Sequence, residues 1–254
     1  MRVFALSDIH LDYDVNVRWL SGLSESDYRD DVLVLAGDVS DSRQLLEQCF
    51  KILTSRFKRV LYLPGNHDLW VFRSKIKETS FEKYDFIREM AKGFDVSMET
   101  FHSGRLSIVP LLGWYDYSFG QPSSELRDIW MDYRACAWPD NFNAPKITRY
   151  FADQNEHAVE TTSNDIIISF SHFLPRIDLI PSYVPASTKV LFPVLGSTLL
   201  EKQIRRLNSA IHIYGHSHLN QRVVLEGISY INNALGYPTE TRISRKNMVS
   251  VFEC

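Results

Sequence analysis

The sequence has 254 residues, of which 44% are hydrophobic, and carries a formal net charge of −3 at pH 7, with 28 basic and 31 acidic residues. This length suits one large domain, or one domain with an insert. Because the charges are mixed and no basic tail occurs, they do not indicate a nucleic-acid partner. No apolar run approaches the roughly 20 residues of a membrane span. The three scattered cysteines suit a reduced protein. We therefore expect a cytoplasmic protein without membrane contact.

The first expected strand covers residues 2–6, and Asp8 and His10 follow it. On an extended chain, two residues separated by one lie on the same face. A carboxylate and an imidazole on one face are a suitable chelating pair for a divalent ion. A solvated strand end is the simpler alternative for this short pattern taken alone.

The second expected strand, residues 31–36, ends in Gly37 and Asp38. Glycine lets the backbone turn there, and Asp38 is delivered at the carboxyl end of the strand. A single carboxylate can bridge two metal ions, because each of its oxygens can bind one. Apolar residues at helical spacing then predict a helix over residues 42–54, with Asp41 as its cap.

The third expected strand, residues 60–63, is stopped by a Pro-Gly pair, and Asn66, His67 and Asp68 follow directly. Open α/β sheets bind their ligands at such strand ends. The alternative is an ordinary polar loop that caps a helix. The amphipathic residues 69–92 that follow read as helical.

After a fourth expected strand at residues 106–112, residues 113–160 form an aromatic-rich insert of irregular period. A long segment of this kind between core elements is often a lid or cap. A satellite hydrophobic cluster packed on the core is the alternative, and both can hold together. If the insert stacks a nucleobase, the candidate substrate contacts are Trp114, Tyr117 and Trp138.

Two later expected strands, residues 165–170 and 210–214, end in His172 and in the pair His216 and His218. Further strands are expected at residues 221–225, 228–231 and 248–252. Five strand ends thus each deliver a candidate ligand. The remaining histidines are expected to be structural or surface residues: His102, His157 and His212.

The ordered pattern Asp-x-His, Gly-Asp, Gly-Asn-His-Asp, His and Gly-His-x-His resembles the calcineurin-like metallophosphoesterases. These motifs span nearly the whole chain, and the region they cover least is 113–160. The resemblance implies one metallophosphoesterase domain over residues 1–254, an α/β protein built as a four-layer α/β/β/α sandwich. Two sheets would face each other with helices outside, and the site would lie on loops at the strand carboxyl ends.

The resemblance also implies a role for each matching residue. A first metal ion would be bound by Asp8, His10 and His218. A second would be bound by Asn66, His172 and His216. Asp38 would bridge both ions. His67 would stay off the metals and face the substrate, with Asp68 beside it to fix its tautomer and raise its basicity.

The implied chemistry uses two divalent or trivalent ions, and mixed nitrogen and oxygen ligands suit Mn, Fe, Zn or Ni. Ions about 3.5–4 Å apart would activate a bridging hydroxide that attacks phosphorus in line, and His67 as imidazolium would protonate the leaving oxygen.

The implied substrate is a small phosphoester such as a nucleotide. A phosphodiesterase is favoured over a phosphomonoesterase or a nuclease. A non-catalytic protein-binding scaffold is a further alternative, but such a protein is expected to have lost ligands, and this chain has lost none.

Overall fold

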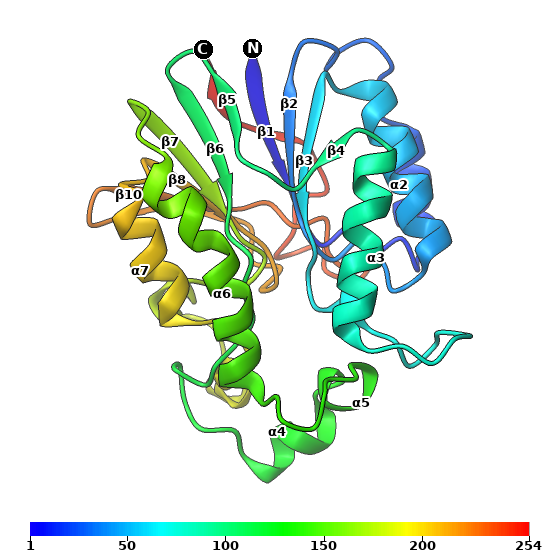
Figure 1. The fold of residues 1–254 in the computed structure, drawn as a ribbon, viewed down its shortest axis with the longest axis vertical. Coiled ribbons are helices and arrows are strands. Elements are labelled where there is room, and N and C mark those ends of the chain that lie inside the picture. The colour runs from blue at the N-terminus through cyan, green and yellow to red at the C-terminus, as the bar shows by residue number, and fades with distance from the viewer. Residues whose placement is uncertain (254) are drawn as a thin grey trace.

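The structure is a computed structural model that describes residues 1–253, so Cys254 lies outside the described residues. Its strands form two sheets (Figure 1). The first sheet has the order β11-β1-β2-β3-β4, with β11 antiparallel at one edge and the others parallel. Its strands are β1 (Arg2–Leu6), β2 (Val32–Ala36), β3 (Arg59–Leu63), β4 (Val96–Ser97) and β11 (Val249–Glu253).

The second sheet has the order β5-β6-β7-β8-β10-β9. Its four central strands are parallel, and β5 and β9 are antiparallel at the two edges. Its strands are β5 (Phe101–Ser103), β6 (Leu106–Pro110), β7 (Ile166–Phe170), β8 (Ile211–Tyr214), β9 (Gln221–Leu225) and β10 (Ile228–Asn232).

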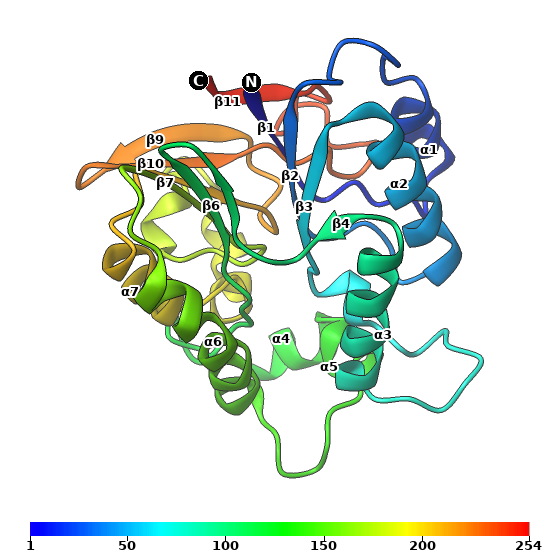
Figure 2. The ribbon, with the colours of Figure 1, turned by 45° about the horizontal axis from the view of Figure 1, so that its top comes forward.

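Helices cover the outer faces of both sheets (Figure 2). The first sheet is covered by α1 (Asp14–Ser21), α2 (Arg43–Arg56) and α3 (Ser80–Gly93). The second is covered by α6 (Ala144–Thr161) and α7 (Thr198–Arg206). The expected four-layer α/β/β/α sandwich is therefore confirmed. Among the described residues, no helix combines the length and hydropathy needed to cross a bilayer.

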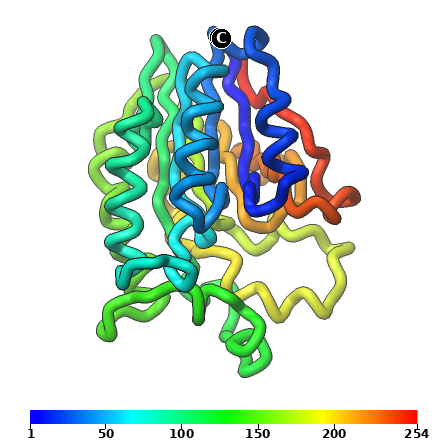
Figure 3. The backbone as a smooth tube through the Cα atoms, turned by 90° about the vertical axis from the view of Figure 1, so that its right-hand side faces the viewer, coloured from blue at the N-terminus to red at the C-terminus, as the bar shows by residue number. Residues whose placement is uncertain are grey.

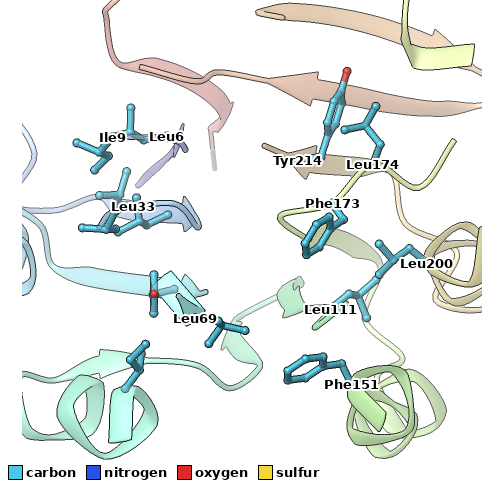
Figure 4. Close-up of a cluster of buried hydrophobic side chains, with 14 of the residues drawn as sticks. Leu6, Ile9, Leu33, Leu69, Leu111, Phe151, Phe173, Leu174, Leu200 and Tyr214 are labelled. Atoms are coloured by element: carbon cyan, nitrogen blue, oxygen red, sulfur yellow. The ribbon is translucent and has the colours of Figure 1, made fainter. Parts of the chain in front are cut away.

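The central strands are apolar on both faces because each face packs against another layer. In β1, Val3 and Ala5 belong to a cluster that both sheets share, so this cluster lies between them. Phe4 and Leu6 alternate with them and belong to the cluster on the helix side. Figure 4 shows part of the helix-side cluster, including Leu33. The continuous apolar runs in the sequence thus reflect burial on both faces.

The expectation of a helix over residues 69–92 is wrong in its first part, because α3 begins only at Ser80. Thr79 caps it by accepting a hydrogen bond from the backbone N–H of Glu82, and the Glu82 carboxylate accepts one from the backbone N–H of Thr79. This capping box stabilises a helix start at that position. The preceding residues 70–79, with their basic side chains, form a loop.

Residues 113–160 divide into two structural parts. The first contains the short helices α4 (Ser124–Ile129) and α5 (Asp132–Ala135), which lie beyond the carboxyl ends of the strands (Figure 1). The second is α6, which packs beside α7 as part of an outer layer. We call residues 113–143 the cap segment. Residues 174–195, which include two 3-10 helices, lie at the same end of the molecule (Figure 3).

Candidate metal centre

The loops after β1, β2, β3, β7 and β8 bring the seven candidate metal ligands together. The side-chain ligand atoms of Asp8, His10 and His218 lie within 4.8 Å of one another. Those of Asp38, His172 and His216 form a second group under the same limit. The amide oxygen of Asn66 lies 3.1 Å from Nε2 of His172, at the second group. A third group under the same limit joins His10, Asp38 and His67, so Asp38 belongs to two of the groups.

The backbone at these residues adopts a rare conformation. Five of the seven have positive φ angles: 50° at Asp8, 45° at His10, 56° at Asp38, 66° at His216 and 54° at His218. Each such residue costs on the order of 1–3 kcal/mol, and strain of this kind clusters at functional sites. The expectation that Asp8 and His10 lie on an extended chain is therefore wrong. Their side chains meet because the loop coils, not because the strand continues.

Two glycines allow the loops after β2 and β3 to approach closely. A Cβ atom on Gly65 would lie 2.1 Å from Oδ1 of Asp38 and 2.7 Å from Cε1 of His172. Gly37 has a φ of +81°, and a Cβ atom there would lie 2.5 Å from the backbone nitrogen of Gly65. A side chain at Gly65 would displace Asp38, and a side chain at Gly37 would push the loop after β3 and His172 away from the loop after β2.

Three of the candidate histidines have one ring nitrogen occupied by an acceptor outside the cluster. Nδ1 of His172 lies 2.9 Å from the carbonyl oxygen of the last β2 residue. Nε2 of His216 lies 3.1 Å from the carbonyl oxygen of Val194, and Nδ1 of His218 lies 2.6 Å from Oε2 of Glu240. Because these oxygens only accept, each ring carries its hydrogen there and presents the other nitrogen to the cluster. This arrangement is typical of metal-binding histidines. The donor set and its orientation therefore fit metal ions.

The charges of the cluster also favour a bound cation. Burial, and then the negative charges of Asp8 and Asp68, raise the pKa of Asp38 well above its usual range. Burial lowers the pKa of His218, but the carboxylates of Asp8 and Glu240 outweigh it and raise this pKa to about 10. Nε2 of His218 lies 3.2 Å from Oδ1 of Asp8.

His67 lies at the edge of the cluster. Its Nε2 is 3.9 Å from Oδ2 of Asp38, and its side chain is 18% exposed. The ring stacks on the indole of Trp70 with centroids 3.7 Å apart, and it meets the His10 ring edge-on at 4.7 Å. Burial, and then the charges of His10 and His172, lower the pKa of His67 well below its usual range.

Asp68 does not orient His67, so this expected role is wrong. Its buried carboxylate accepts five hydrogen bonds of 2.9–3.0 Å, four from backbone N–H groups and one from the Tyr62 hydroxyl. The backbone donors are Asp38, Val39, Ser40 and Gly65. Among the described residues, no hydrogen bond joins Asp68 to the His67 ring. Asp68 instead ties the loop after β2 to the loop after β3.

Two acidic residues that are not among the expected site residues contact the cluster. Glu240 holds His218, as described above. Asp132, in α5 of the cap segment, accepts hydrogen bonds from the Asn66 amide, from Trp70 and from Trp130. No sequence pattern marks either residue, because both lie outside the strand-end motifs. They reach the cluster only through the tertiary fold.

A cavity of about 460 Å³ opens above the cluster. Its polar floor includes Asp38, Asn66 and His67, together with His216 and His218. Its walls are largely apolar and come from the cap segment, from residues 174–195 and from the chain after β10. They include Ile129, Trp130, Ile180, Leu191, Phe192 and Ile243.

The three aromatic residues expected to contact substrate do not line this cavity. Trp114 is 1% exposed and packs among other aromatic side chains, including Trp138 at a centroid distance of 5.2 Å. Trp138 also packs on Phe81 of α3, and the Tyr117 hydroxyl pairs with that of Tyr133. The expected substrate contacts are therefore wrong, because these rings bury one another against the core. The aromatic residues that do line the cavity are Trp70, Trp130, Phe192 and Tyr237.

The chain is similar to known proteins in sequence. The model of the family described as calcineurin-like phosphoesterase matches residues 1–220. One curated relative, named [Acyl-carrier-protein] phosphodiesterase PptH, from Mycobacterium tuberculosis, is 26% identical over 94% of this chain and 79% of its own length. Another, named Uncharacterized protein L509, from Acanthamoeba polyphaga mimivirus, is 23% identical over 92% of this chain and 91% of its own length.

Solved structures show the same fold. The crystal structure described as Phosphopantetheinyl Hydrolase (PptH) from Mycobacterium tuberculosis matches with a TM-score of 0.85 at 22% identity, covering all of this chain and 96% of that one. That of TT1561 from Thermus thermophilus matches with a TM-score of 0.53 at 12% identity, covering 92% and 89%. Since the family model matches most of the chain and a cluster of suitable metal ligands is present, this protein belongs to the calcineurin-like phosphoesterase family and is a metal-dependent phosphoesterase.

Proposed function

We propose that this protein hydrolyses a phosphodiester that joins a long flexible arm to a larger group, as phosphopantetheine is joined to a carrier protein. The observation that carries this proposal is the cavity, which has a polar floor of candidate metal ligands and largely apolar walls. A linear arm with methyl groups matches such walls, while the phosphate matches the floor. The names of the similar proteins, an acyl-carrier-protein phosphodiesterase and a phosphopantetheinyl hydrolase, support the same substrate class.

The proposal includes two metal ions. Asp8, His10 and His218 would bind one, Asn66, His172 and His216 would bind the other, and Asp38 would lie between them. Mixed imidazole, amide and carboxylate ligands suit Mn, Fe, Zn or Ni. Ions of this kind polarise phosphoryl oxygens and supply an activated water when bound.

We propose that His67 donates a proton to the leaving oxygen. Its ring lines the cavity, and the stacked Trp70 fixes the plane in which its nitrogen atoms lie. Burial disfavours the charged ring, but an anionic phosphoester beside it favours the charged form. Protonation of His67 would thus accompany substrate binding, and proton transfer to the leaving oxygen would follow.

A reduced, cytoplasmic location remains part of the proposal. Cys49 and Cys136 are both free thiols, and Cys49 is buried in the core. Free cysteines are usual in a reducing compartment.

The test uses holo-acyl carrier protein with added Mn²⁺ and follows the carrier by intact mass. The proposal predicts that the carrier loses its phosphopantetheine arm, and that bis-p-nitrophenyl phosphate is also cleaved. The variant Phe192→Ala should slow cleavage of the carrier more than cleavage of the aryl ester, because it removes part of the apolar wall. Val224→Ala, on the exposed strand β9, is the control. Cleavage of the aryl ester with no loss of the arm would reject the proposed substrate. It would still support phosphodiesterase activity.

A further inference from the structure

A single buried carboxylate in the cap segment connects three parts of the site. Asp132 is 3% exposed and lies at the start of α5. We infer that Asp132 is a positioning residue for the metal centre. It holds the Asn66 amide with its oxygen toward the other ligands, and it holds the Trp70 indole against His67. This inference rests on the proposed role of Asn66 as a metal ligand.

The first contact fixes the orientation of Asn66. Its Nδ2 atom donates to Oδ1 of Asp132 at 2.9 Å. A carboxylate offers only acceptors, so the amide must turn its nitrogen toward Asp132 and its oxygen away. That oxygen then lies 3.1 Å from Nε2 of His172, among the candidate ligands. The opposite orientation would present N–H groups to a cation, which repels them.

The second contact fixes the surface on which His67 rests. Nε1 of Trp70 donates to the same Oδ1 of Asp132 at 2.6 Å. The Trp70 ring stacks on His67 at 3.7 Å, with an angle of 27° between the two planes. One oxygen atom of Asp132 therefore accepts hydrogen bonds from both Asn66 and Trp70. Since Trp70 stacks on His67, this atom fixes the position of the proposed metal ligand Asn66 relative to the proposed proton donor His67.

The third contact joins this pair to the cavity wall. Nε1 of Trp130 donates to Oδ2 of Asp132 at 2.8 Å, and Trp130 lines the cavity. Its ring centroid lies 5.7 Å from that of His216. A buried carboxylate is rarely the most stabilising choice at a position, because burial removes its hydration. Three convergent donors at the site give Asp132 a positional role as well as a structural one.

The direct test is Asp132→Asn. An amide side chain has one acceptor oxygen, so either Trp130 or the pair of Asn66 and Trp70 must then face an N–H group. We expect one of two bound Mn²⁺ ions to bind about 10- to 100-fold more weakly in a calorimetric titration of the metal-free protein. The kcat for bis-p-nitrophenyl phosphate should fall while KM changes little. The control is Asp128→Asn, an exposed aspartate on α4 of the same cap segment, which should match the wild type.

A double-mutant cycle shows whether Asp132 acts through Asn66. If it does, Asn66→Ala and Asn66→Ala/Asp132→Asn should bind Mn²⁺ equally, because neither retains the oriented amide. Additive losses would overturn the inference, as would wild-type Mn²⁺ affinity and kcat in Asp132→Asn. A wild type that binds no Mn²⁺ would instead reject the proposed metal centre, so the two failures are distinguishable.

A second variant covers the case in which Asp132→Asn does not fold. Trp70→Phe keeps an aromatic ring beside His67 but removes the donor to Asp132. We expect it to retain Mn²⁺ affinity, because Asn66 remains held, and to lower kcat. An unchanged kcat in Trp70→Phe would contradict the part of the inference that concerns His67.

Discussion

His218 and Glu240 form a hydrogen bond of 2.6 Å between Nδ1 and Oε2, while Nε2 of the same ring faces Asp8. This contact orients the imidazole and increases its basicity toward a metal ion. Glu240→Ala should therefore weaken binding of one Mn²⁺ ion by about 10- to 100-fold. Glu240→Gln keeps an acceptor oxygen and should lose less. Metal titration of the two variants measures the difference.

The control for this prediction is Glu125→Ala, an exposed glutamate on α4. It should bind Mn²⁺ as the wild type does. Wild-type affinity for every bound ion in Glu240→Ala would show that Glu240 does not support the metal centre.

His67→Ala separates the proposed proton donor from the metal ligands. We expect unchanged Mn²⁺ stoichiometry and a kcat about 100- to 10,000-fold lower for an alkyl phosphodiester, whose leaving oxygen needs a proton. Esters with a nitrophenolate leaving group should lose much less. Rates for both ester types, measured beside metal content, test this. An alkyl ester cleaved at the wild-type rate would disprove the assigned role.

Asp68→Asn tests the structural role that replaces the expected catalytic one. The Asn side chain would place its own N–H group beside the backbone N–H donors that now bind the Asp68 carboxylate, and two donors cannot form a hydrogen bond. The free energy of unfolding should therefore fall by about 1–3 kcal/mol. Urea unfolding of the metal-free protein measures this. Asp128→Asn is again the matched control. Equal stability of Asp68→Asn and the wild type would mean that the five hydrogen bonds contribute nothing net.

His212 predicts a pH dependence of stability that is separate from the ligand histidines. Its ring lies between the hydroxyls of Ser169 and Ser171, and burial lowers its pKa to about 3. In the unfolded chain this pKa is about 6.5. The unfolded state therefore takes up a proton that the folded state does not, and stability is lost as pH falls below about 6.5. Between about pH 6.5 and about pH 5 this loss is roughly 2 kcal/mol.

The measurement is the free energy of unfolding at about pH 7 and about pH 5 for wild type and His212→Gln. The variant should show a smaller difference between the two pH values, because Gln does not titrate. Parallel curves for the two proteins would show that His212 contributes nothing to the pH dependence.

Most of the fold and the ligand cluster were accessible from the sequence because the signals are local. Apolar runs marked the long strands, and a polar residue followed each run that enters the site. The two-residue strand β4 and the three-residue β5 carry too few residues for a pattern. The amphipathic pattern places the start of α3 too early, although Thr79 and Glu82 form a capping signal in the sequence.

The parts of the site that escaped prediction depend on contacts between distant segments. Asn66 and Asp132 are 66 residues apart, and His218 and Glu240 are 22 apart. Composition identified the cap segment as aromatic but did not distinguish rings that face the cavity, such as Trp130, from rings that pack inward, such as Trp114. Only the packing of the cap segment against α3 and α6 makes that distinction.

We propose that Asp38 would help to hold two metal ions and that these ions would support the cleavage of a phosphodiester. The most direct measurement is the hydrolysis of bis-p-nitrophenyl phosphate and of p-nitrophenyl phosphate with added Mn²⁺, for wild type and Asp38→Asn. We predict Mn²⁺-dependent cleavage by the wild type, faster for the diester, and loss of most of this activity in Asp38→Asn together with weaker Mn²⁺ binding. Wild-type activity in Asp38→Asn, or hydrolysis that persists after complete removal of metal, would contradict the account.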